Sequence, residues 1–249
     1  MARKVLLVTG SGRGIGAATA TLAASHGYAV CVNYLRDRGR ADAVAQEIRT
    51  TGGEAIVVQA DISLELDVLR LFHTVECELG PVSALVNNAG TLGPVGQLSD
   101  LEHDPLRHVI DVNLIGTILC SREAVRRMST RLGGSGGAIV NISSVAATSG
   151  GAGQWLAYAS TKAAINTFTV GLAREVAAEG IRVNAVCPGL IETESHARAG
   201  LGDRLKQLAP TVPMRRIGEP VEVAEAILWL LSERSAYTIG TIITGAGGR

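Results

Sequence analysis

A regular alternation of short apolar runs with longer helical patterns is the feature that most restricts the fold of this chain. Seven runs rich in β-branched residues are apolar almost throughout, rather than alternating between apolar and polar residues. Strands of this kind are covered on both faces, as in a parallel sheet. The expected strands are Lys4–Thr9, Ala29–Tyr34, Ala55–Gln59, Ala84–Asn87, Ala138–Ile142, Arg182–Cys187 and Thr238–Ile243.

The segments between these strands have the apolar spacing of helices that cross from one strand to the next. Such alternation predicts a doubly wound α/β sheet, and no Pro- or Ser-rich linker divides the chain. Residues 190–219 fit neither pattern and follow a late strand, so we expect a substrate lid there, over the carboxyl ends of the strands. The expected helices are Ile15–His26, Arg40–Thr51, Leu64–Leu79, Leu106–Arg131, Trp155–Glu179 and Val221–Ser232.

Composition limits the classes of function. Lys and Arg number 23 and Asp and Glu number 23, so the net charge is zero, which argues against a nucleic-acid-binding protein. With 47% hydrophobic residues the chain is not disordered, and 249 residues can bury one core without a disulfide or a metal. No apolar run is long enough for a signal peptide or a membrane span, so we expect a cytoplasmic protein without a membrane partner.

The metal-binding and redox residue types show no site-like spacing. The four cysteines lie far apart and form no Cys-x-x-Cys pair, so buried, reduced thiols are expected. The five histidines are not spaced as ligands, and no metal site is expected.

The first expected strand runs directly into a glycine-rich turn that opens the first helix. Glycines let the backbone turn sharply and approach a phosphate, and the helix N-terminus offers free N–H groups. The usual dinucleotide-binding fingerprint matches only in its Gly-x-Gly-x-x-Ala form, when it starts at Gly12. A Gly-x-x-x-Gly-x-Gly pattern that starts at Gly10 describes the turn better. A plain strand–helix turn is the alternative. The expected cofactor contacts are Gly10, Ser11, Gly12, Arg13, Gly14, Ile15 and Gly16.

The end of the second strand usually sets the type of dinucleotide, because an acidic residue there binds the ribose 2′-OH and repels a 2′-phosphate. Here the strand ends at Tyr34, Arg36 follows, and Asp37 comes one or two positions late. A guanidinium suits a phosphate dianion, so Arg13 and Arg36 predict a preference for NADP(H), with NAD(H) as the alternative cofactor. The arginines at positions 38 and 40 are interpreted as solvated charges at a helix start.

Three side chains have the chemistry to move a proton onto or off an alcohol oxygen. Tyr158 and Lys162 are four residues apart on an expected helix and share one face, while Ser144 follows an apolar strand. A free tyrosine, with a pKa near ~10, is a poor base. An ammonium ~4 Å away favours the phenolate by ~4 kcal/mol, or ~3 pKa units, at an effective dielectric of ~20. Lys162, aided by a cationic nicotinamide, is therefore expected to lower the pKa of Tyr158 toward neutral pH, and Ser144 to hold the substrate oxygen.

With these motifs in order, nearly the whole chain resembles the short-chain dehydrogenase/reductase family. The resemblance implies a single Rossmann-type domain over residues 1–249, with a seven-stranded parallel sheet and helices on both faces. It also implies a small carbonyl or alcohol substrate and a homotetramer. The motifs that carry it are Thr9–Gly16, Asp61-Ile62, Asn87-Asn88-Ala89-Gly90, Asn113, Ser144, Tyr158-Ala159-Ser160-Thr161-Lys162, and Pro188-Gly189 with Thr193.

The resemblance also implies residue roles. Tyr158 is the general acid/base, Ser144 orients the substrate, Lys162 binds the cofactor ribose and lowers the pKa of Tyr158, and Asn113 helps to hold a proton-relaying water. Tyr158 and Lys162 thus also count as cofactor contacts. The other cofactor contacts implied are Tyr34, Arg36, Asp61, Ile62, Asn88, Ala89, Gly90, Pro188, Gly189, Ile191 and Thr193, with Asn87 structural.

Several residues have a second interpretation. Asp61 or, better, Ser63 suits a helix N-cap, and Pro188-Gly189 suits a simple turn. Trp155 either lines the substrate pocket or packs the helix, and His196 in the lid is interpreted as incidental.

The function class also has competitors. A catalytically idle NADP(H)-binding sensor or scaffold is the main one, and a sugar-nucleotide epimerase shares the Tyr-x-x-x-Lys pair but needs a longer chain. The branches that resemble this chain most are the 3-oxoacyl-carrier-protein reductases and glucose dehydrogenases. The substrate, its stereochemistry, the direction of reaction and docking of an acyl-carrier protein stay open.

Overall fold

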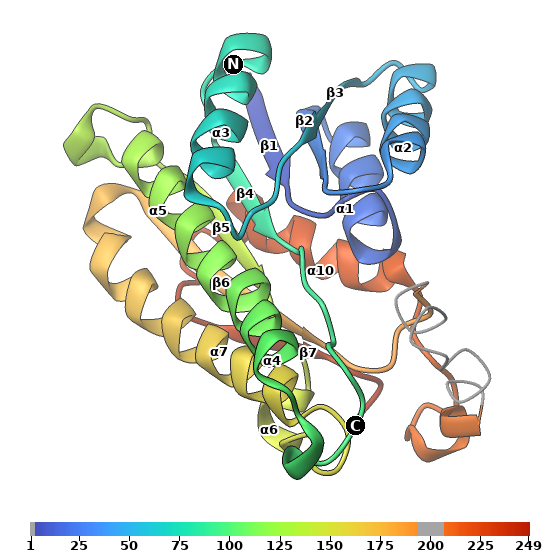
Figure 1. The fold of residues 1–249 in the computed structure, drawn as a ribbon. Coiled ribbons are helices and arrows are strands. Elements are labelled where there is room, and N and C mark those ends of the chain that lie inside the picture. Colours follow the sequence, from blue (N-terminus) through green and yellow to red (C-terminus); the bar gives the residue numbers. More distant parts are fainter. Residues whose placement is uncertain (1–2, 194–206) are drawn as a thin grey trace.

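The apolar runs form one parallel sheet in the order β3-β2-β1-β4-β5-β6-β7 (Figure 1). The computed structural model describes residues 3–193 and 207–249. The strands are β1 (Lys4–Val8), β2 (Tyr28–Tyr34), β3 (Glu54–Gln59), β4 (Ala84–Asn87), β5 (Gly137–Ile142), β6 (Ile181–Pro188) and β7 (Ile242–Gly245). The helices are α1 (Gly14–Ser25), α2 (Arg38–Thr50), α3 (Glu65–Leu79), α4 (His103–Ile110), α5 (Gly116–Met128), α6 (Ala146–Ser149), α7 (Leu156–Val176) and α10 (Pro220–Leu231).

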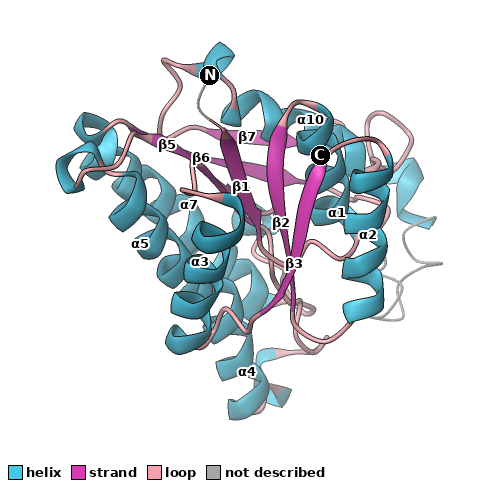
Figure 2. Ribbon diagram, turned by 90° about the horizontal axis from the view of Figure 1, so that it is seen from above, coloured by secondary structure: helices cyan, strands magenta, loops and turns pink. Residues whose placement is uncertain are grey.

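Helices cover both faces of the sheet, which confirms the doubly wound α/β fold (Figure 2). Successive residues of β1 point to opposite faces. Leu6 and Val8 pack in a core with α1, α2 and α10, whereas Val5 and Leu7 pack in a second core with α3, α5 and α7. Two buried faces explain why the strands are apolar throughout.

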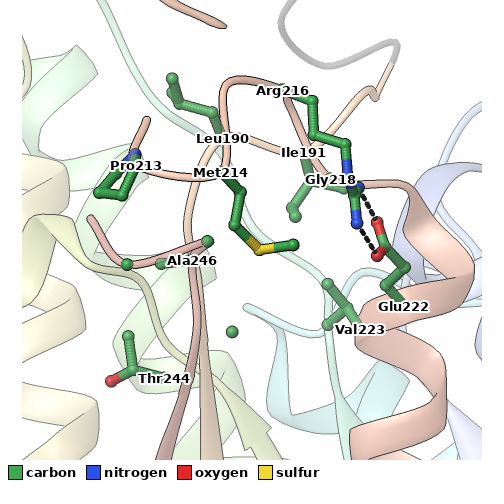
Figure 3. Close-up of a pocket in the computed structure, with 13 residues that line it drawn as sticks. Leu190, Ile191, Pro213, Met214, Arg216, Gly218, Glu222, Val223, Thr244 and Ala246 are labelled. Atoms are coloured by element: carbon green, nitrogen blue, oxygen red, sulfur yellow. Dashed lines mark hydrogen bonds and ion pairs between the residues drawn. The ribbon is translucent and has the colours of Figure 1, made fainter. Parts of the chain in front are cut away.

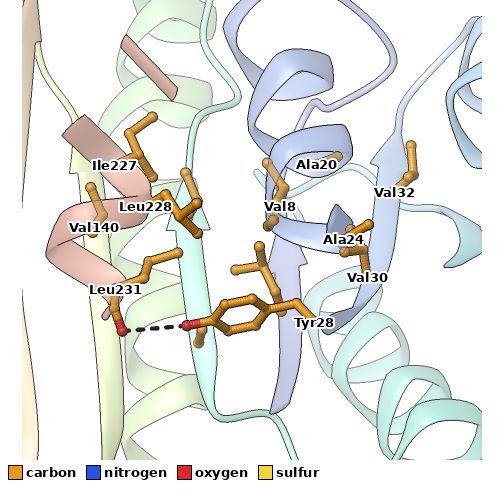
Figure 4. Packing of buried hydrophobic residues seen from close by; sticks show 14 of the residues in the cluster. Val8, Ala20, Ala24, Tyr28, Val30, Val32, Val140, Ile227, Leu228 and Leu231 are labelled. Carbon is orange, nitrogen blue, oxygen red and sulfur yellow. Dashed lines mark hydrogen bonds between the residues drawn. The ribbon is translucent and has the colours of Figure 1, made fainter. Parts of the chain in front are cut away.

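Small residues bring α1 close to the sheet. Ala20 and Ala24 of α1 lie against the apolar side chains of β1 and β2 (Figure 4). In the same core the buried Tyr28 hydroxyl donates to the Leu231 carbonyl oxygen at 3.4 Å, which ties β2 to the end of α10.

Two expected elements differ from the structure. The single helix expected over Leu106–Arg131 is divided into α4 and α5 by a π-helical turn over Asp111–Ile115. The last strand was expected at Thr238–Ile243 but begins at Ile242. A turn in which the Thr238 N–H donates to the Ser235 carbonyl occupies the earlier residues, and Gly240 has a φ of 63°.

Burial of the cysteines agrees with expectation at three of four positions. Cys31, Cys120 and Cys187 are buried, but Cys77 is exposed on α3; all four are free thiols. Desolvation raises the pKa of the Cys120 thiol to about 12, so this thiol stays protonated and unreactive at neutral pH. Among the described helices, none combines the length and apolarity needed to cross a membrane.

Candidate active site

The sheet order places the predicted site at a switch point. The chain moves outward from β1 through β2 and β3, then returns to the other side of β1 with β4. In such sheets ligands bind where the connections diverge, at the carboxyl ends of the strands. The glycine turn follows β1, and Asn88, Ala89 and Gly90 follow β4, so both motifs lie at this point.

The glycine turn has the backbone that its sequence predicts. Gly10 has a φ of 62° and Gly14 a φ of 56°, a region that residues with a side chain rarely adopt. Within the described structure, no side chain caps the N-terminus of α1, and its first turn has no acidic residue. The amide groups at this helix start therefore suit an anion such as a pyrophosphate.

Close packing around Gly16 holds the turn. A Cβ atom at Gly16 would lie 2.5 Å from Asn88 Nδ2, 2.8 Å from Ser11 Cα and 2.9 Å from the Gly10 oxygen. The Asn88 amide donates to the carbonyl oxygens of Thr9 (2.9 Å) and Gly10 (3.0 Å). The Asn88 side chain, expected to contact the cofactor, therefore shapes the turn.

Thr9 and Asn33 also hold the glycine turn in place, although the sequence analysis gave neither residue a role of its own. The Thr9 hydroxyl accepts the N–H groups of Asn88 and Ala89, each at 3.0 Å. Asn33 Oδ1 accepts the Gly10 N–H at 3.0 Å, while its amide donates to β3 and the residue after it. A polar residue buried inside an apolar strand is the signal that marks Asn33. Asn87, interpreted as structural, links β4 to Asn141 of β5 at 2.8 Å.

The end of β2 has the charge distribution that the sequence indicates. Tyr34 is buried and Arg36 is exposed. Asp37 caps α2 by accepting the Arg40 N–H at 3.2 Å and also pairs with the Arg40 guanidinium. The Asp37 carboxylate is thus occupied within its own helix start. A Cβ atom at Gly12 would lie 3.4 Å from the Ala41 nitrogen, so the start of α2 borders the glycine turn.

The loop after β3 differs from the capping interpretation. Ser63 donates its N–H (2.9 Å) and its hydroxyl (2.6 Å) to Asp61 Oδ1, and Leu64 is the N-cap position of α3. Neither Asp61 nor Ser63 caps the helix, because the two side chains satisfy each other in a local turn. Ile62 is buried, and a Cβ atom at Gly116 would lie 2.7 Å from its Cδ1.

The structure brings Ser144, Tyr158 and Lys162 together. Ser144 lies beyond β5 and hydrogen-bonds Tyr158, which projects from the first turn of α7. Lys162, one turn later, is 5% exposed, and its Nζ lies 5.6 Å from the centroid of the Tyr158 ring. The same Nζ donates to the Ile142 carbonyl oxygen at 2.7 Å. The three groups form one polar cluster in which Lys162 is buried and Ser144 and Tyr158 are half-buried.

The pKa of Tyr158 departs from the sequence-based expectation. Burial raises the pKa of the Tyr158 phenol above its usual range, and the hydrogen bond from Ser144 offsets this only in part. Burial also lowers the pKa of Lys162 to about 8, so its ammonium is easily lost above neutral pH. In the protein without cofactor, desolvation thus outweighs the charge of Lys162, which the Ile142 carbonyl oxygen already engages. The expected lowering of the Tyr158 pKa also involves the cationic nicotinamide, and it stays a prediction for the complex.

The low pKa of Lys162 makes stability pH-dependent. Between the folded pKa, about 8, and the unfolded value of ~10.4, the unfolded chain binds more protons, so stability rises with pH. We expect urea unfolding to show wild type gaining about 2 kcal/mol relative to Lys162→Met between about pH 7 and pH 9.5. A constant difference over this range would contradict a buried, destabilised ammonium.

Asn113 lies on the π-helical turn and is fully buried. Its Oδ1 accepts the Thr91 N–H at 2.8 Å, and its Nδ2 donates to the Thr91 oxygen (2.9 Å) and the Thr161 hydroxyl (3.1 Å). A Cβ atom at Gly90 would lie 3.2 Å from Asn113 Oδ1 and 3.7 Å from Lys162 Nζ. The π-helical turn, of a type frequent at functional sites, therefore places Asn113 beside Gly90 and Lys162.

The segment from Pro188 to Thr193 joins the two halves of the site. The Val145 N–H donates to the Pro188 oxygen at 3.1 Å, next to Ser144. At the other end, Thr193 Cγ2 lies 3.4 Å from the Cβ position of Gly14. Ile191 is predicted to contact the nicotinamide end; its side chain is 4% exposed and packs on Gly218.

The expected lid is described only at its two ends. Glu192 and Gly218 pair through a 2.9 Å hydrogen bond, which brings those ends together, and His196 lies outside the described residues. A largely apolar cavity of about 620 Å³ lies between the segment after β6, the start of α10 and the last residues of the chain (Figure 3). Trp155 is the N-cap residue of α7, and its buried indole Nε1 has no hydrogen-bond partner among the described residues. In the described ranges, no three His, Cys, Asp or Glu side chains gather as metal ligands.

Comparison with known proteins agrees with this geometry. A family model described as enoyl-(acyl carrier protein) reductase matches residues 10–249. Uncharacterized oxidoreductase YgfF of Escherichia coli (strain K12) is 48% identical over 245 residues, which are 98% of this chain and 99% of that protein. The 3-oxoacyl-(acyl-carrier-protein) reductase FabG of Staphylococcus epidermidis is 36% identical over 246 residues, 98% of each chain. A mutant short-chain dehydrogenase/reductase of Serratia marcescens has a TM-score of 0.89 and 34% identity, covering 98% of this chain and 97% of its own. The chain is therefore an oxidoreductase of the short-chain dehydrogenase/reductase family.

Proposed function

We propose that this protein is an NADP(H)-dependent oxidoreductase that moves a hydride between nicotinamide and a carbonyl or secondary alcohol. Membership of the family implies a nicotinamide cofactor and a small-molecule substrate. The observation that carries the proposal is the cluster of Ser144, Tyr158 and Lys162 at the carboxyl end of the sheet, on the same edge as the glycine turn. FabG, by its name, reduces a ketone on a carrier-bound acyl group, which supports a ketone or secondary alcohol here.

The side chains divide the chemistry among them. The Ser144 hydroxyl holds the substrate oxygen, and the Tyr158 hydroxyl donates a proton to it during reduction or accepts one during oxidation. Bound nicotinamide supplies or takes up the hydride. Because burial raises the pKa of Tyr158, the unliganded protein holds this residue protonated, ready to act as the acid in carbonyl reduction. Lys162 positions the ribose and adds positive charge near Tyr158 while it is protonated.

The residues present fit the cofactor. The positive-φ glycines and the N-terminus of α1, which has no side-chain cap, suit the pyrophosphate. The lack of a side chain at Gly90, next to Lys162, suits a close approach of the ribose. In this proposal Asp61 and Ile62 border the adenine, Ala89 and Gly90 the ribose, and Pro188, Gly189 and Thr193 the nicotinamide end. Ile191 contributes its backbone alone, and Asn113 supports a water-mediated proton path near Lys162.

A preference for NADP(H) is the first consequence to test. Arg36 is exposed after β2, and Arg13 is the N-cap residue of α1. Arg13→Ala with Arg36→Ala is expected to raise the Kd for NADPH at least tenfold more than the Kd for NADH, since only NADPH carries the 2′-phosphate. Fluorescence titration with both cofactors measures this, and Arg38→Ala, which removes the surface ion pair with Asp42, is the control. Equal losses for both cofactors would refute the assignment.

Assembly as a homotetramer is a further part of the proposal. The outer face of α7 exposes the small residues Ser160, Thr167 and Gly171, which permit close helix–helix packing. Light scattering of the purified protein is expected to give four times the mass of 25.8 kDa. A monomeric mass would overturn the proposed tetramer but would leave the proposed reaction unaffected.

The activity test follows NADPH absorbance with an acetoacetyl thioester, simple ketones and diketones, and NADP reduction with glucose and other sugars. We expect turnover with at least one carbonyl–alcohol pair. The identity of the substrate that reacts will show whether the protein acts on acyl thioesters, simple carbonyl compounds or sugars. Tight NADPH binding with no turnover across the panel would favour the idle sensor or scaffold instead.

A further inference from the structure

The Thr161 hydroxyl joins α7 to the π-helical turn that carries Asn113. Thr161 lies between Tyr158 and Lys162 in the chain and is 3% exposed. Its Oγ1 donates to the Tyr158 carbonyl oxygen at 2.7 Å and accepts a hydrogen bond from Asn113 Nδ2 at 3.1 Å. A hydroxyl has one hydrogen to donate, and Tyr158 takes it, so the bond with Asn113 has a fixed direction.

Both amide hydrogens of Asn113 are used in this arrangement. Besides the bond to Thr161, Nδ2 donates to the Thr91 oxygen at 2.9 Å, and Oδ1 accepts the Thr91 N–H at 2.8 Å. Thr91 directly follows Gly90, one of the expected cofactor contacts. The hydrogen bonds therefore run without a break from the backbone after β4, through Asn113 and Thr161, to the backbone of Tyr158.

This chain of bonds supports the first turn of α7. Tyr158 is the third residue of the helix, and the side chain of the N-cap residue, Trp155, makes no capping hydrogen bond. The first turn of a helix has N–H groups without intrahelical partners, and helix ends fray. A buried link from Asn113 to this turn therefore fixes the position of Tyr158 relative to the backbone after β4.

A second threonine of α7 makes the same kind of bonds away from Asn113. Thr169 is fully buried, donates to the Ile165 carbonyl oxygen at 2.8 Å and accepts a hydrogen bond from Asn141 Nδ2 at 2.9 Å. Asn141 belongs to β5. Loss of the hydroxyl is thus expected to destabilise the fold at either threonine, whereas the partners of Thr161 are themselves residues of the candidate site.

We propose that Thr161 is a positioning residue for the reaction, which holds Tyr158 and Asn113 in one arrangement beside the cofactor site. The inference rests on the proposed function, because Thr161 acts through these two residues. Thr161→Val keeps nearly the same shape but leaves one amide hydrogen of Asn113 without its acceptor. Because a buried, unpaired donor is unfavourable, the variant favours a shift of Asn113 relative to α7.

The test compares Thr161→Val, Thr161→Ser and the control Thr169→Val with wild type, using the best substrate of the activity panel. Stopped-flow measurement of a single turnover at saturating NADPH gives the rate of hydride transfer without product release. We expect Thr161→Val to lower this rate at least about tenfold while the Kd for NADPH stays within about threefold. Thr161→Ser keeps the hydroxyl and is expected to stay within about twofold of the wild-type rate. Thr169→Val is expected to lower the urea midpoint as much as Thr161→Val and to keep the wild-type rate.

Two results would overturn the positioning role and leave the proposed chemistry standing. One is a wild-type rate in Thr161→Val. The other is an equal loss of rate in Thr169→Val or in Thr161→Ser, because the loss would then not depend on the hydroxyl at position 161.

Amide hydrogen exchange gives a readout that does not need turnover. We expect residues 157–162 to exchange at least about fivefold faster in Thr161→Val than in wild type, and at the wild-type rate in Thr169→Val. If wild type turned over no substrate, the proposed function would fail, and this faster exchange would still show that the hydroxyl holds Tyr158. Unchanged exchange in Thr161→Val would overturn the inference.

Discussion

Tyr158→Phe is expected to lower kcat/KM about a thousandfold or more with the best substrate of the panel, while the Kd for NADPH stays within about twofold of wild type. The change removes only the hydroxyl, so the ring still fills its place between Ser144 and Lys162. The variant then lacks the hydroxyl that donates the proton to the substrate oxygen, and Lys162 Nζ is engaged by the Ile142 oxygen. Steady-state kinetics with a cofactor-binding titration measures both effects.

Tyr28→Phe is the matched control for this substitution. Tyr28 is also buried, and its hydroxyl makes one long hydrogen bond to the Leu231 oxygen on the far side of the fold. We expect this variant to lose about 1 kcal/mol of stability with no change in kcat. If Tyr158→Phe kept more than a tenth of wild-type turnover, another group would have to be the acid, and the assignment of Tyr158 would be wrong.

Gly16→Ala is expected to have the largest effect on cofactor binding. The added Cβ atom would lie under 3.0 Å from three atoms, and two of these, Ser11 Cα and the Gly10 oxygen, belong to the backbone of the turn. Neither can rotate away, so the turn must shift, at a cost of about 1–3 kcal/mol in stability. A shifted turn no longer points its amides at the pyrophosphate, and we expect the Kd for NADPH to rise at least thirtyfold.

Gly96→Ala provides the comparison for that loss. Gly96 is exposed, its φ is ordinary, and no atom lies within 4 Å of its Cβ position. Its unfolding free energy and NADPH Kd are expected to match wild type within about 0.5 kcal/mol. Urea unfolding and fluorescence titration of both variants check the pair. Near-normal NADPH binding by Gly16→Ala would show that the turn does not hold the pyrophosphate.

The local sequence pattern was sufficient to predict most of the strands and helices. A strand that is buried on both faces is apolar at most positions, so β1 to β6 could be predicted from single runs of residues. The glycine turn could also be read directly, since only glycine adopts the backbone of Gly10 and Gly14 without strain. Tyr158 and Lys162 share a helix face by spacing alone. Each of these depends on neighbours within a few residues in the chain.

Features that depend on distant contacts could not be read in this way. β7 begins at Ile242 because Gly240 and Thr241 first hydrogen-bond to Val183 and Asn184 of β6. The π-helical turn at Asn113 forms where that side chain bonds Thr91 and Thr161, residues far away in sequence.

The sequence by itself therefore determined the α/β class, the glycine turn and the shared helix face of Tyr158 and Lys162, because short-range backbone geometry and helix spacing encode them. The tertiary structure alone decided the raised pKa of Tyr158, the lowered pKa of Lys162 and the burial of the Ile191 side chain. It also decided the existence of an apolar cavity beside Leu190. Burial is the physical reason, because it is set by segments that meet only in the folded chain, and it disfavours the charged forms of both Tyr158 and Lys162.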